Sequence, residues 1–482
     1  MSLAYPLLAF LPIILLFVIS LWKGVRTGVY ASFALTSLLF FFWGNPVVAY
    51  LASIFSALLG TINILMIIFG AVFLYQIMEQ KGYIKGIKES LAEIHPDKGF
   101  RFFFLAFFLT SFFESVSGFG TPLAIVPLLL ISIGFSPLLS ISTVLLIDGL
   151  FSVAGAVGTP IQAGMEIPLG LASGTVNKIY LYATLLLLIA GLVLLYFIIR
   201  FYRQETSDQK QGKTGIIMYL SIMLPFFSIS YFFKELSGLL ASVFMAVFAY
   251  VFLFKNKKLL WKPWMPYWVL VGLLLIPKLF TEFADLISYK LEFLSIYGTD
   301  ISASLQPFKS PLIPFLATAL FVLYHSRSFT IDLKPVISKT VIVFLMLFPS
   351  LAITQLMINS GNELPSMLTM LANVFSKAGP FYVLVSPYIG ILGAFISGST
   401  TVSNIIFGPV QLTSSIQLNL PQDVLLAIQV AGASLGNAVC LFNIIAAAAV
   451  TGTKEYGLIL KKNILPIMLA ALICGLIGYV LI

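Results

Sequence analysis

Charged residues are scarce in this sequence: Asp, Glu, Lys and Arg together make up 9% of the 482 residues. Soluble domains carry about 25% charged residues, and hydrophobic residues here reach 60%. A chain of this length and composition cannot bury its apolar surface in one core surrounded by water. The composition therefore excludes a soluble globular protein and predicts a multi-pass protein of the cell membrane.

Histidine and cysteine are almost absent, with two residues of each. His95 lies in a predicted loop and His325 at the end of an apolar segment, so they form no metal-ligand pattern. Nucleophilic catalysis needs a base beside the nucleophile, and neither His lies in the interior of an apolar segment. We therefore expect neither an enzyme nor a bound cofactor. Cys440 and Cys474 lie inside apolar segments, which is more typical of small core residues than of a disulfide.

Long apolar runs, in contrast, recur along the whole chain. A helix needs about 20 apolar residues to cross the hydrocarbon core of a bilayer. The sequence predicts an all-α polytopic membrane protein with about twelve transmembrane helices. The predicted spans are 4–21, 28–43, 58–79, 136–156, 177–200, 214–232, 237–254, 265–282, 311–325, 336–358, 422–449 and 459–481.

Two further apolar segments, 101–135 and 380–418, are interrupted by polar residues. The first contains Phe-Phe-Glu-Ser-Val-Ser-Gly-Phe-Gly-Thr-Pro at 112–122, and the second contains Ser-Gly-Ser-Thr-Thr-Val-Ser-Asn at 397–404. Broken backbone inside a bilayer is tolerated only where it is buried in protein or lines a wet cavity. Transporters bind substrates and coupling ions at such breaks. The two segments therefore indicate a solute carrier.

The distribution of Lys and Arg predicts the topology. Basic clusters follow the first, third, fifth and seventh predicted spans, and the positive-inside rule places all of them in the cytoplasm. If 101–135 crossed the membrane fully, the cluster at 200–213 would lie outside. We therefore predict that 101–135 and 380–418 are re-entrant hairpins and that both termini are external. The net charge of +9 then reflects cytoplasmic loops and does not indicate a nucleic-acid partner.

The predicted elements occur in the same order in both halves of the chain. Each half has three spans, a short amphipathic helix, a hairpin, a broken span and a last span. We predict a first inverted repeat at 1–205, connecting spans at 206–262 and a second inverted repeat at 263–482. Inverted repeats with breaks at mid-depth are typical of alternating-access carriers.

Two carboxylic acids, Glu114 and Asp148, lie within apolar segments. An ionised carboxylate there costs several kcal/mol, so each must be neutral, paired or hydrated. A carboxyl that is neutral when buried suits a proton carrier, and we predict proton-coupling roles for both. The alternative for each is a structural hydrogen bond.

Small and hydroxyl-bearing residues occur at the tips of both predicted hairpins and in the predicted spans that follow them, 136–156 and 422–449. Glycine lets backbone amides approach a ligand closely, and helix N-termini hold anions. The alternative is helix packing through small residues. The predicted substrate-binding residues are Ser115, Ser117, Gly118, Gly120, Thr121, Thr159, Gln162, Gly398, Ser399, Thr400, Thr401, Ser403, Asn404, Asn437 and Asn443.

The first tip, Glu114-Ser-Val-Ser-Gly-Phe-Gly-Thr-Pro122, resembles the corresponding segment of the L-lactate permease family. The second tip, Gly398-Ser-Thr-Thr-Val-Ser-Asn404, and the segment Ala156-Val-Gly-Thr-Pro160 are also similar to that family. The resemblance implies import of L-lactate, and often glycolate, together with protons. It also implies an elevator-type anion carrier architecture, and a homodimer is one assembly compatible with it.

The sequence departs from the family pattern at three places. Thr400 stands where an Asp is frequent, Asn437 stands where a Lys is frequent, and Leu441-Phe-Asn-Ile-Ile replaces a stretch rich in Pro and Gln. With no basic residue at either tip, an anion would be held by amides, hydroxyls and helix dipoles. Two alternatives stay open: a sodium-coupled or exchanging carrier for another small anion, and, less favoured, an intramembrane enzyme.

Overall fold

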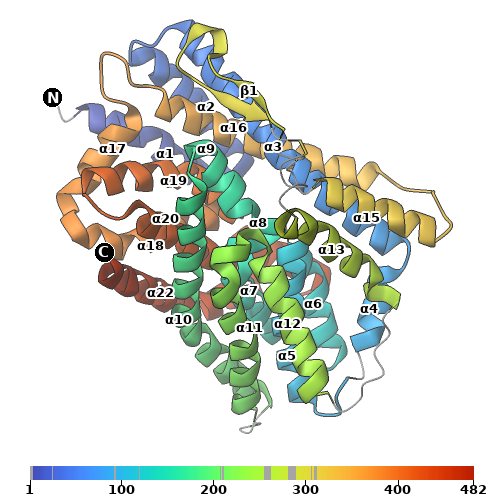
Figure 1. Ribbon diagram of the computed structural model, residues 1–482. Coiled ribbons are helices and arrows are strands. Elements are labelled where there is room, and N and C mark those ends of the chain that lie inside the picture. The colour runs from blue at the N-terminus through green and yellow to red at the C-terminus, as the bar shows by residue number, and fades with distance from the viewer. Residues whose placement is uncertain are drawn as a thin grey trace.

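A computed structural model gives the structure of the chain. It describes residues 4–482 except 24, 92–93, 119, 207, 209–210, 255–261, 281–288, 306 and 309–311. The described residues are almost entirely helical (Figure 1). The long chain of apolar residues with few charges accounts for this, because helices satisfy their own backbone hydrogen bonds within one segment.

The first half of the chain contains ten α-helices and two short irregular helical turns. These are α1 (Ala4–Lys23), α2 (Val25–Phe42), α3 (Val47–Gln80), α4 (Tyr83–Leu91), α5 (Lys98–Val116), α6 (Thr121–Ser132), α7 (Pro137–Phe151), η1 (Ser152–Ala154), α8 (Gly155–Ile161), η2 (Gln162–Glu166), α9 (Ile167–Leu169) and α10 (Ser173–Thr206).

The rest of the chain adds further helices and two short strands. They are α11 (Gly212–Phe233), η3 (Lys234–Leu236), α12 (Ser237–Phe252), η4 (Lys262–Trp264), α13 (Met265–Leu279), β1 (Leu291–Phe293), η5 (Ile296–Gly298), β2 (Ala303–Leu305), α15 (Leu312–His325), α16 (Lys334–Ile358), α17 (Met367–Phe375), η6 (Ser376–Phe381), α18 (Tyr382–Ser397), α19 (Thr400–Gln417), α20 (Gln422–Gly436), η7 (Asn437–Val439), α21 (Leu441–Thr451) and α22 (Tyr456–Leu481).

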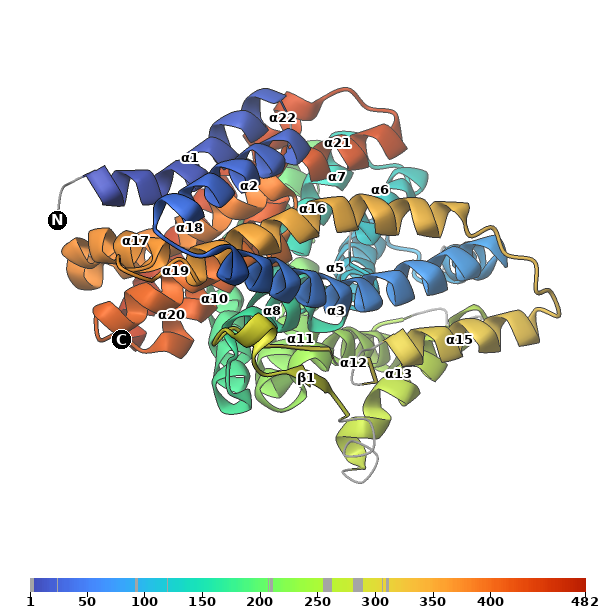
Figure 2. The ribbon, with the colours of Figure 1, turned by 90° about the horizontal axis from the view of Figure 1, so that it is seen from above.

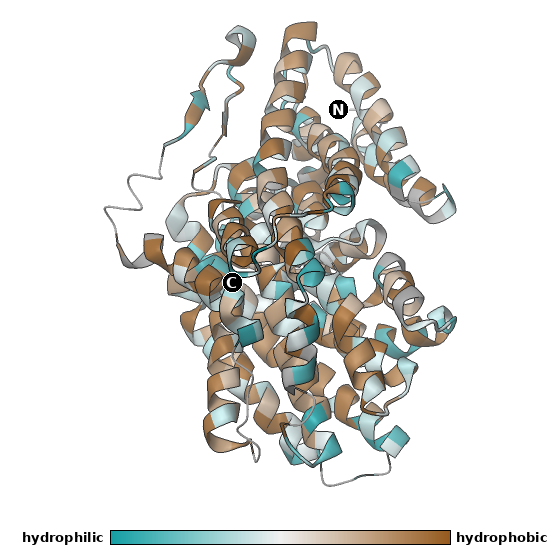
Figure 3. Ribbon diagram, turned by 90° about the vertical axis from the view of Figure 1, so that its right-hand side faces the viewer, coloured by the Kyte–Doolittle hydropathy of each residue, from teal (hydrophilic) through white to brown (hydrophobic). Residues whose placement is uncertain are grey.

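Nine helical segments among the described residues are long and apolar enough to cross a membrane. Hydrophobic residues run along most of the helices (Figure 3). One of the nine, Gly212–Phe252, contains both α11 and α12, which turn at Lys234 and pack against each other. In their described residues, all twelve predicted spans coincide largely with helix, while positions 281–282 and 311 of the predicted spans lie outside the described residues. The shorter helices, such as Leu312–His325, fall below the length of a full span. The chain is a multi-pass membrane protein.

Two groups of helices organise the molecule. The long helix α3 lies beside α15 and α16, and α2 also contacts α16 (Figures 1 and 2). The other group contains α5, α6, α7, α10, α11 and α12 together with α18, α20 and α22. The buried side chains of this group form the main hydrophobic core together with side chains of α3, α13 and α15. A second hydrophobic cluster joins α1, α2, α16, α17 and α19.

The two interrupted segments form helix–turn–helix units. Helix α5 packs against α6, and α18 packs against α19. Gly118 and Gly120 have φ of 55° and 78°, and Gly398 has φ of 70°. Only glycine adopts such left-handed angles without steric cost. At the second turn the Ser399 hydroxyl accepts a hydrogen bond from the backbone N–H of Val402, at 3.3 Å, which caps α19.

The helix that follows each unit is broken. Near the start of α8, three consecutive residues, Ala156, Val157 and Gly158, are left-handed, with φ of 41°, 54° and 77°. This conformation is strained for a β-branched valine. The Thr159 hydroxyl donates to the Ala156 carbonyl at 2.6 Å, and the Tyr180 hydroxyl donates to the Gly158 carbonyl at 3.2 Å. These side chains replace helical hydrogen bonds that the break removes.

The break between α20 and α21 is similar in outline. The Asn443 side chain donates to the Asn437 carbonyl at 3.2 Å, and the Asn463 side chain donates to the Ala438 carbonyl at 3.0 Å. Buried amides therefore satisfy the carbonyls that the short turn η7 leaves without helical partners. A helix–turn–helix unit followed by a broken helix thus occurs in each half.

One element lies outside the predicted all-α fold. Strands β1 and β2 form a small antiparallel hairpin in which Glu292 faces Ser304. The Asn63 side chain on α3 donates to the Ser304 carbonyl at 2.7 Å. The hairpin is confined to the connection between α13 and α15, and the rest of the described fold is helical, as predicted.

Candidate functional site

A cavity of about 400 Å³ lies where the two turns, the two helix breaks, α3 and α16 meet. Each half of the chain contributes one turn and one break to its wall. The polar lining consists mainly of hydroxyls, amides and two carboxyls, while α3 and α16 contribute mostly apolar side chains such as Val72 and Met346. A concave site of this size with a few convergent polar groups suits a small ligand.

Glu114 and Asp148 meet in this cavity. They are 6% and 3% exposed, and their carboxyl groups lie within hydrogen-bonding reach of one another. Two ionised carboxylates this close and this buried would repel each other strongly, which makes the pair a candidate site for binding a proton. The Ser152 hydroxyl, one turn after Asp148, donates to the Asp148 carbonyl at 2.7 Å and lies 3.5 Å from Oδ2.

The position of the Glu114 carboxyl depends on a glycine. A Cβ added to Gly155 would collide with Glu114 Oε1. Gly118 is also close to the broken helix, because its Cβ would lie 3.1 Å from the backbone nitrogen of Ala156. The first turn and the first break are therefore fitted to each other, and the fit brings Glu114 beside Asp148.

The two breaks are joined by hydrogen bonds between the halves. The Asn437 side chain donates to the Ser152 hydroxyl at 3.0 Å, and the Ser434 hydroxyl donates to the Gly149 carbonyl at 2.9 Å. Asp148, Ser152 and Asn437 therefore form one chain of polar groups. Within the described protein, Asp148 Oδ1 and Asn437 Oδ1 are buried and have no hydrogen-bond partner.

Most of the predicted site residues line the cavity. They are Glu114, Ser117, Gly118, Gly120, Thr121, Asp148, Thr159, Gly398, Ser399, Thr400, Thr401, Asn437 and Asn443. These residues come from two turns and two broken helices that are far apart in the sequence, and the tertiary structure brings them together.

Four predicted residues lie outside the cavity lining. Ser115 packs against Gly238 on α12. Gln162 lies in the π-helical turn η2. The Ser403 hydroxyl donates to the Gly390 carbonyl at 2.8 Å, and the Asn404 side chain donates to the Pro160 carbonyl at 2.9 Å. Ser403 and Asn404 therefore join helices, which is the packing alternative considered for small polar residues.

The sequence reasoning did not include α3 and α16 in the site. Tyr75 on α3 and Lys339 on α16 both line the cavity, and the Lys339 ammonium lies 5.9 Å from the centre of the Tyr75 ring. Lys339 is not among the predicted site residues. Its position inside the predicted span 336–358 was the available signal, because a cation within a span is costly unless it faces protein or water.

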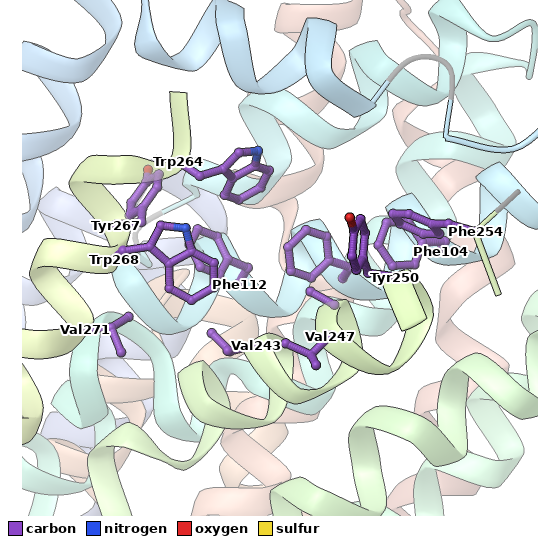
Figure 4. A pocket seen from close by; sticks show the side chains of 12 residues that line it. Phe104, Phe112, Val243, Val247, Tyr250, Phe254, Trp264, Tyr267, Trp268 and Val271 are labelled. Atoms are coloured by element: carbon purple, nitrogen blue, oxygen red, sulfur yellow. The ribbon is translucent and has the colours of Figure 1, made fainter. Parts of the chain in front are cut away.

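A second cavity, of about 190 Å³, lies between α5, α12 and α13. Figure 4 shows aromatic and aliphatic side chains around it, including Phe112, Tyr250 and Trp264. No residue that lines it is charged. This cavity does not offer a small anion the polar groups that orient a ligand.

Comparison with known proteins agrees with the motifs. The family model described as L-lactate permease matches residues 6–265 and 260–482. A putative L-lactate permease of Haemophilus influenzae is 25% identical, over 90% of each chain. An L-lactate permease of Escherichia coli strain K12 is 25% identical over 98% of this chain and 96% of its own.

A third relative carries a different substrate in its name. The glycolate permease GlcA of Escherichia coli strain K12 is 25% identical over 92% of this chain and 90% of its own. All these relatives are permeases, which means transporters and not enzymes. Since the family model covers nearly the whole sequence, this chain belongs to the L-lactate permease family.

Proposed function

We propose that this chain is a secondary active transporter that imports a small monocarboxylate, such as L-lactate or glycolate, together with protons. The observation that carries the proposal is the pair of buried carboxyls, Glu114 and Asp148, in a cavity walled by two hydroxyl-rich turns. The cavity therefore contains both a carboxyl pair that can hold a proton and two turns that can hold an anion. The family and its relatives support the substrate class.

The two turns would bind the substrate. Helices α6 and α19 both begin at the cavity, at Thr121 and Thr400. The first turn of a helix has backbone N–H groups without helical partners and carries partial positive charge. The start of α19 would hold the carboxylate of the substrate, and the hydroxyls of Ser117, Ser399 and Thr401 would bind its oxygens. The start of α6 offers fewer donors, because the Thr121 N–H donates to the Gly118 carbonyl and Pro122 has no N–H.

The two acids would carry the proton. Moving an ionised carboxylate through a low-dielectric barrier is costly, and protonation removes that cost. In the proposed cycle, Glu114 and Asp148 share one proton while the empty carrier returns, take up a second proton when substrate binds outside, and release that second proton on the cytoplasmic side. Ser152 and Asn437 would hold the Asp148 carboxyl in place during this exchange.

We further propose that the chain moves as an elevator. The repeats would be 1–205 and 263–482, related by inversion, with re-entrant units at 101–135 and 380–418 and external termini. The cavity is bounded on one side by both turns and on the other by α3 and α16. This arrangement supports a sliding motion of the turn-bearing group along α3 and α16, which would expose the substrate to each side in turn.

A sodium-coupled or exchanging carrier is the second candidate. The observation that favours sodium coupling is the pair of buried oxygens, Asp148 Oδ1 and Asn437 Oδ1, which lack a hydrogen-bond partner in the described protein. Both residues line the cavity. Oxygen atoms of this kind are the ligands that hard cations prefer, so a sodium gradient must be tested beside a proton gradient.

The test is concentrative uptake of labelled L-lactate and glycolate into proteoliposomes between pH 5 and 8, with an imposed proton or sodium gradient. We expect the proton gradient to drive accumulation by the wild type. We expect Glu114→Gln to abolish accumulation while some substrate binding survives, and Asp148→Asn to do the same or to change the pH dependence. If both variants still accumulate substrate with wild-type pH dependence, neither acid carries the proton and sodium coupling becomes the better account.

A further inference from the structure

We propose that Lys339 is the cationic residue that binds the substrate anion at the cytoplasmic mouth of the cavity. This inference rests on the proposed function and deepens it. The two turns contain no basic residue, so the cation that favours an anion over a neutral solute must come from another element. The structure brings α16 to the cavity, and Lys339 with it.

The wall around Lys339 would strengthen its effect on an anion. Lys339 is exposed, and its α16 neighbours in the cavity wall, Ile342, Val343 and Met346, are apolar. A charge beside low-dielectric walls raises the local concentration of ions of opposite sign. Among the described residues that line the cavity, Lys339 is the one Lys or Arg, while Glu114 and Asp148 are acids.

The contacts of Lys339 leave its charge available to a ligand. Its ammonium lies 5.9 Å from the centre of the Tyr75 ring, and the ring face positions the ammonium without neutralising it. In the described part of the chain, no carboxylate forms a salt bridge with Lys339. The Glu79 carboxylate instead accepts from the Tyr75 hydroxyl, at 3.4 Å.

The competing explanation is that Lys339 only anchors α16 at the membrane surface. Long basic side chains near helix ends extend toward the interface. Lys334, the first residue of α16, fits that explanation, because it begins the helix and does not line the cavity. Lys339 lies more than one turn further into the helix and faces the cavity, so the two lysines make a matched pair for a test.

The contacts at the N-terminal end of α16 indicate the side of the membrane on which Lys339 lies. Lys81, at the end of α3, donates to the Ser328 hydroxyl and to the Thr330 carbonyl, each at 2.8 Å, in the loop before α16. The positive-inside rule assigns this basic end to the cytoplasm. Lys339 would therefore act on substrate that enters or leaves from the cytoplasmic side.

The experiment measures the KM for L-lactate from each side, in right-side-out and inside-out vesicles, for the wild type, Lys339→Gln, Lys339→Arg and Lys334→Gln. We expect Lys339→Gln to raise the cytoplasmic-side KM about tenfold and to raise the maximal rate of efflux in proportion, with little change in the external KM, because without a driving gradient the ratio of maximal rate to KM must be the same in both directions. Lys339→Arg should keep most of the wild-type KM, and Lys334→Gln should match the wild type. Added salt should raise the cytoplasmic KM of the wild type more than that of Lys339→Gln, because salt screens the ammonium.

Two results would overturn the assignment of Lys339. An unchanged cytoplasmic KM in Lys339→Gln, or an equal rise on both sides, would contradict a role at the cytoplasmic mouth. If the wild type itself does not transport L-lactate or glycolate, the proposed function fails instead. Thermal stabilisation of the purified protein by L-lactate gives a readout without transport, and loss of stabilisation in Lys334→Gln as well as in Lys339→Gln would also count against a specific role.

Discussion

At the scale of single residues, the chemistry of the cavity depends on where two carboxyls are held. Glu114 comes from α5 and Asp148 from α7, and the turn and break between them decide their separation. The Ser152 hydroxyl then donates to the Asp148 carboxyl, and the Asn437 side chain donates to the Ser152 hydroxyl. An acid in an apolar segment becomes part of a pair only because small residues allow the two helices to approach.

Gly155→Ala tests that dependence. The added methyl group would collide with Glu114 Oε1, so we expect the carboxyl to be displaced from Asp148 and proton-driven uptake to fall. Overpacking a buried site costs roughly 1–3 kcal/mol, which a thermal unfolding measurement in detergent would detect. Gly174→Ala is the control, because nothing lies within 4 Å of its added Cβ. Wild-type uptake by Gly155→Ala would show that Glu114 need not occupy this position.

At the scale of elements, helix starts and breaks position the site. Helix α5, which carries Glu114, begins with Asp97 as its N-cap, and the Asp97 carboxylate accepts hydrogen bonds from the N–H groups of Gly99 and Phe100 at 2.8 and 3.0 Å. It also accepts one from the Gln211 side chain, at 2.8 Å. Burial alone would raise the pKa of Asp97, but these hydrogen bonds outweigh burial and hold the pKa below its ordinary value.

The lowered pKa of Asp97 makes its stabilisation depend on pH. A depressed carboxyl pKa contributes stability above the unfolded value of about 3.9 and loses it as the pH falls through the folded pKa. We therefore expect Asp97→Ala to lower the free energy of unfolding by about 1 kcal/mol at pH 7. The difference from the wild type should shrink as the pH falls below about 4, as followed by thermal unfolding in detergent.

Asp97→Asn provides the control for this prediction. The Asn side chain keeps an oxygen that can accept the backbone hydrogen bonds of a cap, but it does not titrate. We expect it to retain most of the stability at pH 7 and to lose the pH-dependent part. Equal stability of the wild type and Asp97→Ala at pH 7 would mean that the cap contributes nothing to α5.

At the scale of the whole molecule, the site exists only because the two halves meet. The Asn404 side chain on α19 donates to the Pro160 carbonyl at 2.9 Å, and Ser434 on α20 donates to the Gly149 carbonyl. These contacts join residues more than 240 positions apart in the sequence. Neither turn alone encloses a cavity, because each contributes only part of the wall.

The predicted topology can be tested with cysteines that report on each side. We expect Asp208→Cys, between α10 and α11, to be protected from a membrane-impermeant thiol reagent applied to intact cells, because its loop is assigned to the cytoplasm. Gln422→Cys, at the start of α20, should be labelled from outside. Cys440 and Cys474 are buried and should give little background. Labelling of position 208 from outside would reverse the predicted orientation.

Much of the architecture followed from the sequence by itself. Apolar runs predicted the helices because hydrocarbon requires internally satisfied backbone, and in its described residues each predicted span coincides largely with helix. The glycines at 118, 120 and 398 predicted the turns, and each has the left-handed backbone that glycine permits. Glu114 and Asp148 were recognisable as site candidates because a carboxyl in an apolar segment is too costly to be incidental.

Only the tertiary structure decided which polar residues face the cavity. Ser403 and Asn404 lie in the same motif as Thr400 and Thr401, yet they pack against other helices while the threonines line the cavity. The sequence cannot separate these roles, because hydroxyls and amides inside a membrane serve packing and binding equally well. Lys339 likewise is not among the residues predicted for the site, and only the packing of α16 brings it to the cavity. Local composition determines which segments are helical. Whether a side chain lines the cavity or packs between helices depends on neighbours that are distant in the sequence.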